Sequence, residues 1–220
     1  MPYLALDTSG GIAVAVVDDD GSVAARAADT QPRQHAERLA PCIAAVLAEA
    51  GVGAGDLDGV VVGTGPAQFT GLRAGLVTAR TLARALEVPV LGVPSFAATA
   101  LVALETLDEG SQVVVVTDAR RHEVYWARYA RDDRLRIRAV DGPGVAAPVD
   151  VPTHGAVLVG RGAPLVAPTD DHLAGLDPDP AALCTVALAL RDHGEPTPCE
   201  PLYLRRPDAV PPAQVAQVRQ

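Results

Sequence analysis

Two segments of the chain place an aspartate at the head of a tight turn, an arrangement that can hold the phosphates of a nucleotide. The first is Asp7-Thr8-Ser9-Gly10-Gly11, and the second is Asp118-Ala119-Arg120-Arg121-His122-Glu123. Small and hydroxylic residues let backbone N–H groups approach phosphate oxygens. The first turn, with Asp7, Thr8, Ser9 and Gly10, meets this requirement, whereas the second has no glycine and is bulky and charged. Phosphate chemistry is therefore expected at the first turn, if anywhere.

The arginines of the second turn allow three interpretations. Arginine side chains bind phosphate, so Arg120 and Arg121 could contact phosphate groups of a partner in a larger complex. They could equally fill the space that a nucleotide would occupy. An internal ion pair with Asp118 or Glu123 is the third interpretation, and the sequence favours it.

A repeated pattern of strand, aspartate, tight turn and strand must position the two turns. Tyr3–Asp7 leads into Ile12–Asp18, and Gln112–Asp118 leads into Glu123–Ala130. Such a repeat predicts a duplicated fold with two lobes and a cleft between them. We expect an N-terminal lobe at 1–108, a C-terminal lobe at 109–210 and a tail at 211–220.

The remaining elements follow from hydrophobic periodicity and from glycine and proline breaks. Helices are predicted at Arg33–Ala50, Thr70–Leu86, Ser95–Leu107 and Pro180–Asp192, and further strands at Val23–Ala28, Gly59–Thr64, Pro89–Val93, Leu135–Val140 and Ala156–Gly160.

The first two predicted helices carry more apolar surface than one core contact requires. The apolar arc of Arg33–Ala50 is about 200° wide, against the ~100° stripe typical of a surface helix. In Thr70–Leu86 the small residues Gly71, Gly75, Ala79 and Ala83 form a ridge that another helix can approach closely. Either the chain buries both sides of these helices itself, or one side meets a partner.

Composition excludes several classes of function. The net charge of −9 argues against a stand-alone nucleic-acid binder. Cys42, Cys184 and Cys199 form no CxxC pair, which disfavours a zinc site or a disulfide framework. No apolar run is long enough to span a bilayer, and the N-terminus has no secretory signal, so residence in the cytoplasm is expected.

Several segments, taken together, resemble the TsaB (YeaZ-type) family, and they occur in its order over most of the chain. The most specific is Gly65-Pro66-Ala67-Gln68-Phe69-Thr70-Gly71-Leu72-Arg73-Ala74-Gly75; the others are Asp7-Thr8-Ser9, Gln34-His35-Ala36-Glu37-Arg38-Leu39-Ala40-Pro41, Gly92-Val93-Pro94-Ser95, Asp118-Ala119-Arg120-Arg121-His122-Glu123-Val124-Tyr125 and Pro201-Leu202-Tyr203-Leu204-Arg205. One departure is Ala67-Gln68, where the family usually has small residues.

The resemblance implies an α/β fold: a duplicated actin-like ATPase domain of the sugar kinase and Hsp70 type, with a degenerate second lobe. It implies a non-catalytic subunit without a cofactor. The implied partners are a TsaD-like catalytic subunit, a TsaE-like ATPase and, in place of TsaD, a second TsaB. The implied complex transfers threonylcarbamoyl to the tRNA adenosine beside the anticodon, and this chain meets tRNA only through it.

The resemblance also implies that the first two helices meet matching helices of the partner in a four-helix contact. The expected contact residues are Leu39, Ile43, Leu47, Leu72, Leu76 and Ala79. The rival interpretation is that all six belong to the internal core.

Two other functions remain as alternatives. In a small-molecule kinase of the same fold, Asp7 would position a metal-bound water while Thr8, Ser9 and Gly10 hold phosphate; Asp7 could instead simply cap its turn. A metallopeptidase would need a metal site, but none of the five histidines has a mate four residues away on a helix.

Overall fold

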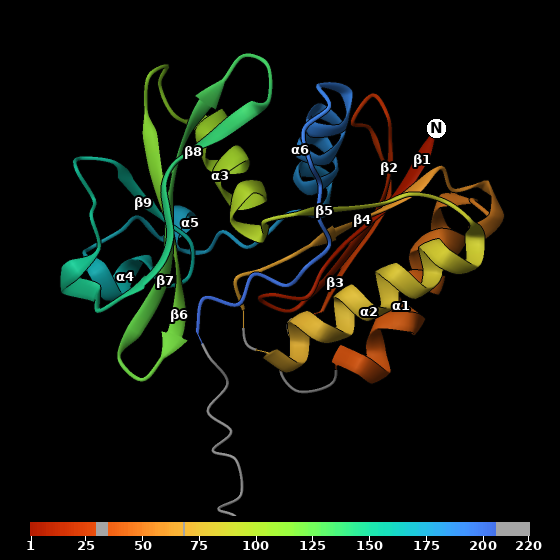
Figure 1. Ribbon diagram of the computed structural model, residues 1–220, viewed down its shortest axis with the longest axis horizontal. Helices are drawn as coiled ribbons and strands as arrows, with labels where there is room; N and C mark the ends of the chain where they lie inside the picture. The colour runs from red at the N-terminus through yellow and green to blue at the C-terminus, as the bar shows by residue number, and fades with distance from the viewer. Residues whose placement is uncertain (30–34, 68, 206–220) are drawn as a thin grey trace, which may run out of the picture.

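The computed structural model describes residues 1–29, 35–67 and 69–205, which form two β-sheets with helices between them and outside them (Figure 1). The first sheet has the strand order β3-β2-β1-β4-β5. Its strands are β1 (Pro2–Asp7), β2 (Ile12–Asp18), β3 (Val23–Asp29), β4 (Gly59–Gly63) and β5 (Val90–Val93). Strands β1, β2 and β3 form an antiparallel meander, whereas β4 pairs with β1 in parallel and β5 pairs with β4 in parallel.

The second sheet repeats the connectivity of the first. Its order is β8-β7-β6-β9, with β6 (Gln112–Arg120), β7 (Glu123–Asp132), β8 (Arg136–Ala146) and β9 (Val157–Val159). Here too an antiparallel meander is followed by a strand parallel to the first. In the described part of the chain this sheet has no counterpart of β5. The predicted duplicated α/β fold with a reduced second lobe is confirmed.

The helices occupy separate layers. The helices α1 (His35–Ala50) and α2 (Phe69–Leu86) cover the outer face of the first sheet, and α3 (Ser95–Thr106) and α6 (Pro180–Asp192) lie between the two sheets (Figure 1). The short elements are η1 (Ala54–Asp56), η2 (Pro148–Asp150), α4 (Ala163–Val166) and α5 (Asp171–Ala174). None of the helices described here is both long and apolar enough to cross a membrane.

The alternation of side chains along β1 explains why the first sheet needs helices on both faces. Leu4 and Leu6 join the outer core under α1 and α2, whereas Tyr3 and Ala5 join the core between the sheets. All five residues of β4 are buried. A strand covered on both faces reads as a continuous apolar run, which is how Gly59–Gly63 appears in the sequence.

The two central helices are exchanged between the lobes. The helix α3 follows the first sheet in the chain but packs against β6, β7 and β8, and α6 follows the second sheet but packs against β1 and β2. Phe96 of α3 lies fully inside the shared core. The division predicted near residue 108 falls between α3 and β6, but packing does not separate the lobes there. The predicted tail at 211–220 lies outside the described residues.

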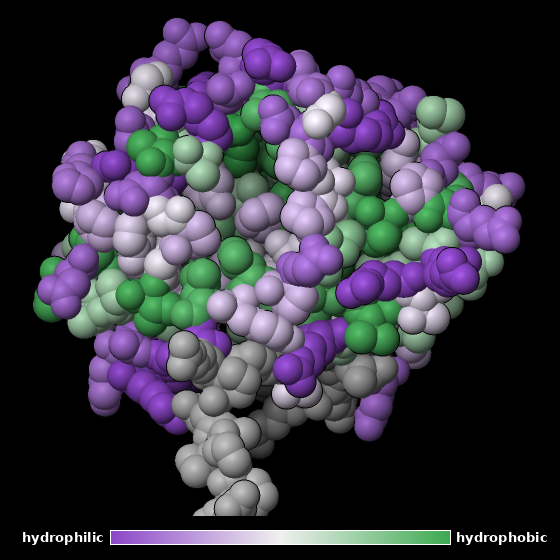
Figure 2. Space-filling model, viewed as in Figure 1, coloured by the Kyte–Doolittle hydropathy of each residue, from purple (hydrophilic) through white to green (hydrophobic). Residues whose placement is uncertain are grey.

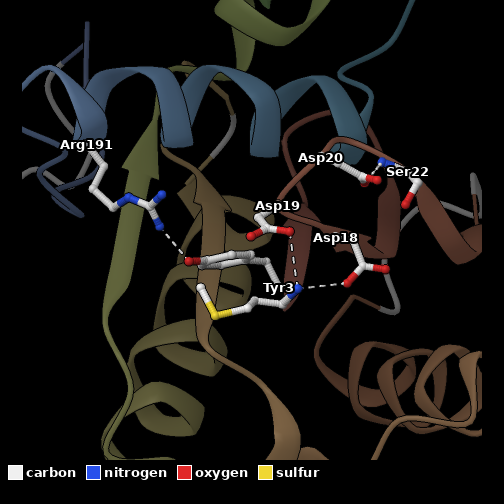
Figure 3. A network of polar contacts seen from close by, with 7 residues as sticks. Tyr3, Asp18, Asp19, Asp20, Ser22 and Arg191 are labelled. Carbon is white, nitrogen blue, oxygen red and sulfur yellow. Dashed lines mark hydrogen bonds and ion pairs between the residues drawn. The ribbon is translucent and has the colours of Figure 1, made fainter.

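Polar contacts fasten α6 and the chain start to the first sheet (Figure 3). Arg191 donates a hydrogen bond from Nη1 to Tyr3 Oη over 2.5 Å, and its guanidinium lies 5.7 Å from the centre of the Tyr3 ring. The ammonium group of Met1 lies 3.2 Å from carboxylate oxygens of both Asp18 and Asp19. These contacts tie the first strand to β2 and to the last helix.

Burial predicts different reactivities for the cysteines. Cys184 lies inside the core between the sheets, and burial raises the pKa of its thiol to about 12. Because the thiolate is the reactive form, we expect Cys184 of the folded protein to resist a thiol reagent at mildly alkaline pH, while the partly exposed Cys42 reacts. Mass spectrometry of labelled peptides, with and without denaturant, measures both. Labelling of Cys184 in the folded protein at the rate of Cys42 contradicts the prediction.

Candidate functional site

The carboxylate of Asp7 is enclosed by serines at the end of β1. Its Oδ1 accepts hydrogen bonds from Ser9 N (2.7 Å) and Ser9 Oγ (2.5 Å). Its Oδ2 accepts a 2.5 Å hydrogen bond from Ser95 Oγ at the start of α3. Asp7 is 2% exposed, so a buried carboxylate has its hydrogen bonds met by the protein itself.

Backbone from two other elements closes around the same carboxylate. Ser95 Oγ also accepts a hydrogen bond from Gly65 N (3.1 Å), which joins the loop after β4 to α3. A Cβ atom on Gly63 would overlap Asp7 Oδ2, so only glycine fits at the end of β4. The ends of β1 and β4 and the start of α3 therefore meet at one point.

The next residue of the first turn is packed onto α2. Thr8 is buried, and its Oγ1 donates a 2.9 Å hydrogen bond to the carbonyl oxygen of Gly71. A Cβ atom on Gly75 would overlap Thr8 Oγ1. The small residues that the sequence places on α2 thus serve in part to admit the first turn.

Electrostatics at Asp7 follow from its burial. Desolvation raises the pKa of Asp7 above its ordinary value of 3.8, the hydrogen bonds from Ser9 and Ser95 oppose the shift, and the negative charge of Asp177 adds to it. The charged form of Asp7 is therefore disfavoured in the fold relative to water.

A pocket of about 270 Å³ adjoins the first turn. It is lined by Gly10 and Gly11, by parts of β2 and β3, and by the segment 177–180 before α6. Its volume lies just under the roughly 300–1,000 Å³ typical of small-molecule sites. Its charged groups have protein partners, since Arg161 pairs with Asp177 and Arg26 with Asp179.

The second turn is a tight hairpin built from residues that disfavour its geometry. Arg120, Arg121 and His122 have φ angles of 63°, 57° and 62°. Left-handed conformations cost roughly 1–2 kcal/mol for each residue that carries a Cβ atom. All three side chains are exposed, so this hairpin presents cationic groups to the surface.

Both aspartate and glutamate of the second turn are paired. Asp118 accepts a 2.7 Å hydrogen bond from Arg120 N, and its Oδ2 lies 3.5 Å from Arg120 Nη1. Glu123 forms its ion pair with Arg205 near the end of the described chain. Of the internal pairings expected for Arg120, the one with Asp118 is present, whereas Glu123 is engaged by Arg205.

The structure corrects the expected location of most partner-contact residues. Leu39, Ile43, Leu72, Leu76 and Ala79 are all buried in the outer core against the first sheet, and only Leu47 is partly exposed. A helical arc does not reveal which side faces its own sheet. The internal-core interpretation therefore describes five of these six side chains.

The outer sides of α1 and α2 remain accessible. Exposed alanines, among them Ala44 and Ala48, lie on α1, and Val77 of α2 is 63% exposed. Apolar residues reach the surface among charged ones in this region of Figure 2. This surface, defined here by Ala44, Ala48 and Val77, is called the outer helix face below.

Sequence reasoning missed two residues that complete the first turn, Gly63 and Ser95. Ser95 was predicted only as the start of a helix, and its distance from Asp7 in the chain hid the contact. Gln68 of the unusual Ala67-Gln68 pair lies outside the described residues. Within those residues, no group of three His, Cys, Asp or Glu side chains is placed to hold a metal ion.

The shifted pKa of Asp7 predicts a pH dependence of stability. Because the folded-state pKa is raised, the folded protein binds the proton more tightly, and stability falls as pH rises from about 3.8 through the folded-state value. Asp7→Asn removes this titration. We expect the unfolding free energy of Asp7→Asn, minus that of the unmodified protein, to increase with pH in urea titrations.

Asp20→Asn is the matched control for this measurement. Asp20 also accepts a hydrogen bond from the residue two positions on, Ser22, but it is exposed, and those bonds lower its pKa. The unfolding free energy of Asp20→Asn, minus that of the unmodified protein, should therefore decrease as pH rises. The prediction is contradicted if the difference in unfolding free energy between Asp7→Asn and the unmodified protein stays constant or decreases as pH rises.

The arrangement defines a class of protein: a two-lobed α/β fold built from two related sheets, in which the carboxylate of the first turn is enclosed by the protein's own side chains. The family model described as TsaD, tRNA N6-adenosine threonylcarbamoyltransferase, matches residues 23–149, more than half of the chain. The structure of YeaZ from Pseudomonas aeruginosa superposes with a TM-score of 0.77 at 32% identity, covering 92% of this chain and 99% of that one.

Two further relatives are similar to this chain over most of its length. An uncharacterized protein of Mycobacterium tuberculosis H37Rv is 44% identical over 184 residues, or 81% of this chain and 79% of that protein. The tRNA threonylcarbamoyladenosine biosynthesis protein TsaB of Escherichia coli K12 is 35% identical over 133 residues, or 60% of this chain and 57% of that protein. The chain belongs to the TsaB (YeaZ-type) family.

Proposed function

We propose that this chain is a non-catalytic scaffold subunit in the biosynthesis of threonylcarbamoyladenosine in tRNA. In this role it binds a TsaD-like catalytic subunit, which transfers threonylcarbamoyl to the adenosine beside the anticodon. Membership of the TsaB family supports the pathway, since relatives carry that role in their names. The closure of Asp7 by Ser9 and Ser95 is the observation that carries the non-catalytic role.

The closed first turn opposes phosphoryl-transfer chemistry by this subunit. A catalytic aspartate in such a site holds a metal-bound water or the nucleophile. For Asp7 to do so, its carboxylate would have to exchange serine hydrogen bonds for a metal ion in a site that already disfavours its charge. The second turn adds bulky cationic side chains where small residues would be needed.

The small-molecule kinase remains the alternative that can be tested most simply. It requires the isolated chain to bind ATP, and the pocket beside Asp7 is about 270 Å³ with its charged groups already paired. Calorimetric titration with Mg-ATP distinguishes the two functions, since tight binding by the isolated chain favours the kinase.

The outer helix face supplies a docking surface for the partner. Alanine and valine side chains let a second pair of helices approach closely, and apolar surface removed from water contributes roughly 25 cal/mol per Å². The arginines Arg73, Arg80 and Arg84 on the exposed side of α2 give this surface a charged border. A four-helix contact with matching helices of a TsaD-like protein, or of a second copy, fits this composition. A TsaE-like ATPase joins the complex in this proposal.

Val77→Arg tests the docking surface. The substitution places a charge at an exposed position of α2, so it should leave the fold intact and weaken binding of the TsaD-like protein from the same genome by at least ~10-fold, about 1.4 kcal/mol. Calorimetry or co-purification with that protein measures the loss, and light scattering shows whether a homodimer is lost as well.

Val149→Arg is the control, because Val149 is 90% exposed in η2, on the second lobe. It introduces the same charge away from α1 and α2 and should bind like the unmodified chain. The outer helix face is not the docking surface if folded Val77→Arg binds the TsaD-like protein as tightly as the unmodified chain does. The same conclusion follows if Val77→Arg and Val149→Arg lose equal affinity.

The exposed arginines of the second turn are proposed to contact tRNA phosphates in the assembled complex. Arg120→Ala combined with Arg121→Ala should lower the rate of tRNA modification by the reconstituted complex and weaken its dependence on salt, since phosphate contacts release counterions. Binding of the TsaD-like subunit should be unchanged. Full activity at every salt concentration contradicts this contact.

A further inference from the structure

The chain that follows α6 crosses from the first lobe to the second. In Figure 1 the blue segment leaves α6, passes β5 and reaches the side of the molecule where β6 and β7 meet. We define residues 197–205 as the strap. It has no regular secondary structure, so its position depends on contacts with the two lobes.

The first anchor of the strap is the outer edge of the first sheet. Gly92 N of the edge strand β5 donates a 3.0 Å hydrogen bond to the carbonyl oxygen of Thr197. A Cβ atom on Gly92 would overlap the carbonyl of Pro198. Cys199 packs against the core under α1 and α2. The strap therefore lies on β5 so closely that only glycine is accommodated there.

The middle of the strap contacts the loop after β4 and the helix α2. Leu202 N donates a 2.8 Å hydrogen bond to the carbonyl oxygen of Thr64, next to the glycine that bonds Ser95. Tyr203 Oη accepts a 2.7 Å hydrogen bond from Arg73 Nε, and its ring lies 5.5 Å from that guanidinium.

The last anchor is the second turn, on the other lobe. Arg205 donates from Nη1 to the carbonyl oxygen of Ala119 over 2.9 Å and forms an ion pair with Glu123. The adjacent Leu204 packs against the core between the sheets. Four residues of strap, from Leu202 to Arg205, thus join the surroundings of the first turn to the second turn.

We propose that the strap is a built-in tether that couples the second turn to the first lobe, as a ligand bound between the lobes otherwise would. A ligand that contacts both lobes stabilises the arrangement in which it makes both sets of contacts. The strap makes such contacts permanently, because it is part of the chain and its effective concentration is high. The second turn is then ordered through the strap by contacts made at β5.

Gly92→Ala tests this coupling, because it acts at one anchor and the readout lies at the other. The added methyl group displaces the strap from β5 without touching the second turn. We expect amide hydrogen exchange at 118–123 to become about tenfold faster, as local opening loses its tethering hydrogen bonds. Arg205→Ala acts at the opposite anchor, so it should instead speed exchange at 64–65, where Leu202 bonds the carbonyl oxygen of Thr64.

Gly55→Ala is the control, since a Cβ atom at Gly55 meets nothing within 4 Å. It should leave exchange at 118–123 unchanged. Faster exchange confined to β5 and the strap in Gly92→Ala, with the second turn unaffected, overturns the proposal and leaves the strap as a cover for a sheet edge. If Gly92→Ala does not fold, Arg205→Ala decides, because unchanged exchange at 64–65 in that variant overturns the proposal equally.

Discussion

The burial of one carboxylate, that of Asp7, sets the geometry on which the rest of the first lobe depends. A buried charge is costly unless hydrogen bonds compensate for it, and here they come from Ser9 and from Ser95 on a different element. Gly63 must lack a side chain for the carboxylate to fit. One residue thus brings the ends of β1 and β4 to the start of α3, and the small residues around it are consequences of that packing.

The start of α3 connects this point to the second lobe. The helix begins at Ser95 beside Asp7 and then lies on the second sheet, while α6 returns from the second lobe to cover the first sheet. An exchange of helices gives the lobes one shared core rather than two separate ones. Domain motion in a two-lobed fold is largest when the interface is small and polar. The apolar shared core works against such motion here.

Local patterns in the sequence predicted most of the fold, and long-range contacts account for what they missed. The boundaries of β2 and α6 were predicted to the residue, since strand alternation, apolar runs and proline or glycine stops are local signals. The phosphate-type turn was also visible, but its closure was not, because Ser95 lies 88 residues from Asp7. The partner-contact residues were misplaced because alanines widen the apolar arc of each helix, and such an arc does not reveal which side faces the sheet.

A scaffold and a ligand-driven switch make opposite demands on the same fold. A switch needs two arrangements that a ligand distinguishes by differential affinity, and in a two-lobed protein the cleft turns are where the ligand would act. Here the Asp7 carboxylate of the first turn accepts hydrogen bonds from Ser9 and Ser95, and Arg205 donates a hydrogen bond to the second turn. Side chains of the protein therefore already make the contacts at the two turns that a ligand would need to make. A ligand then has few contacts left by which to favour one arrangement of the lobes. A protein built in this way holds α1 and α2 in fixed positions, which is what the proposed scaffold role requires.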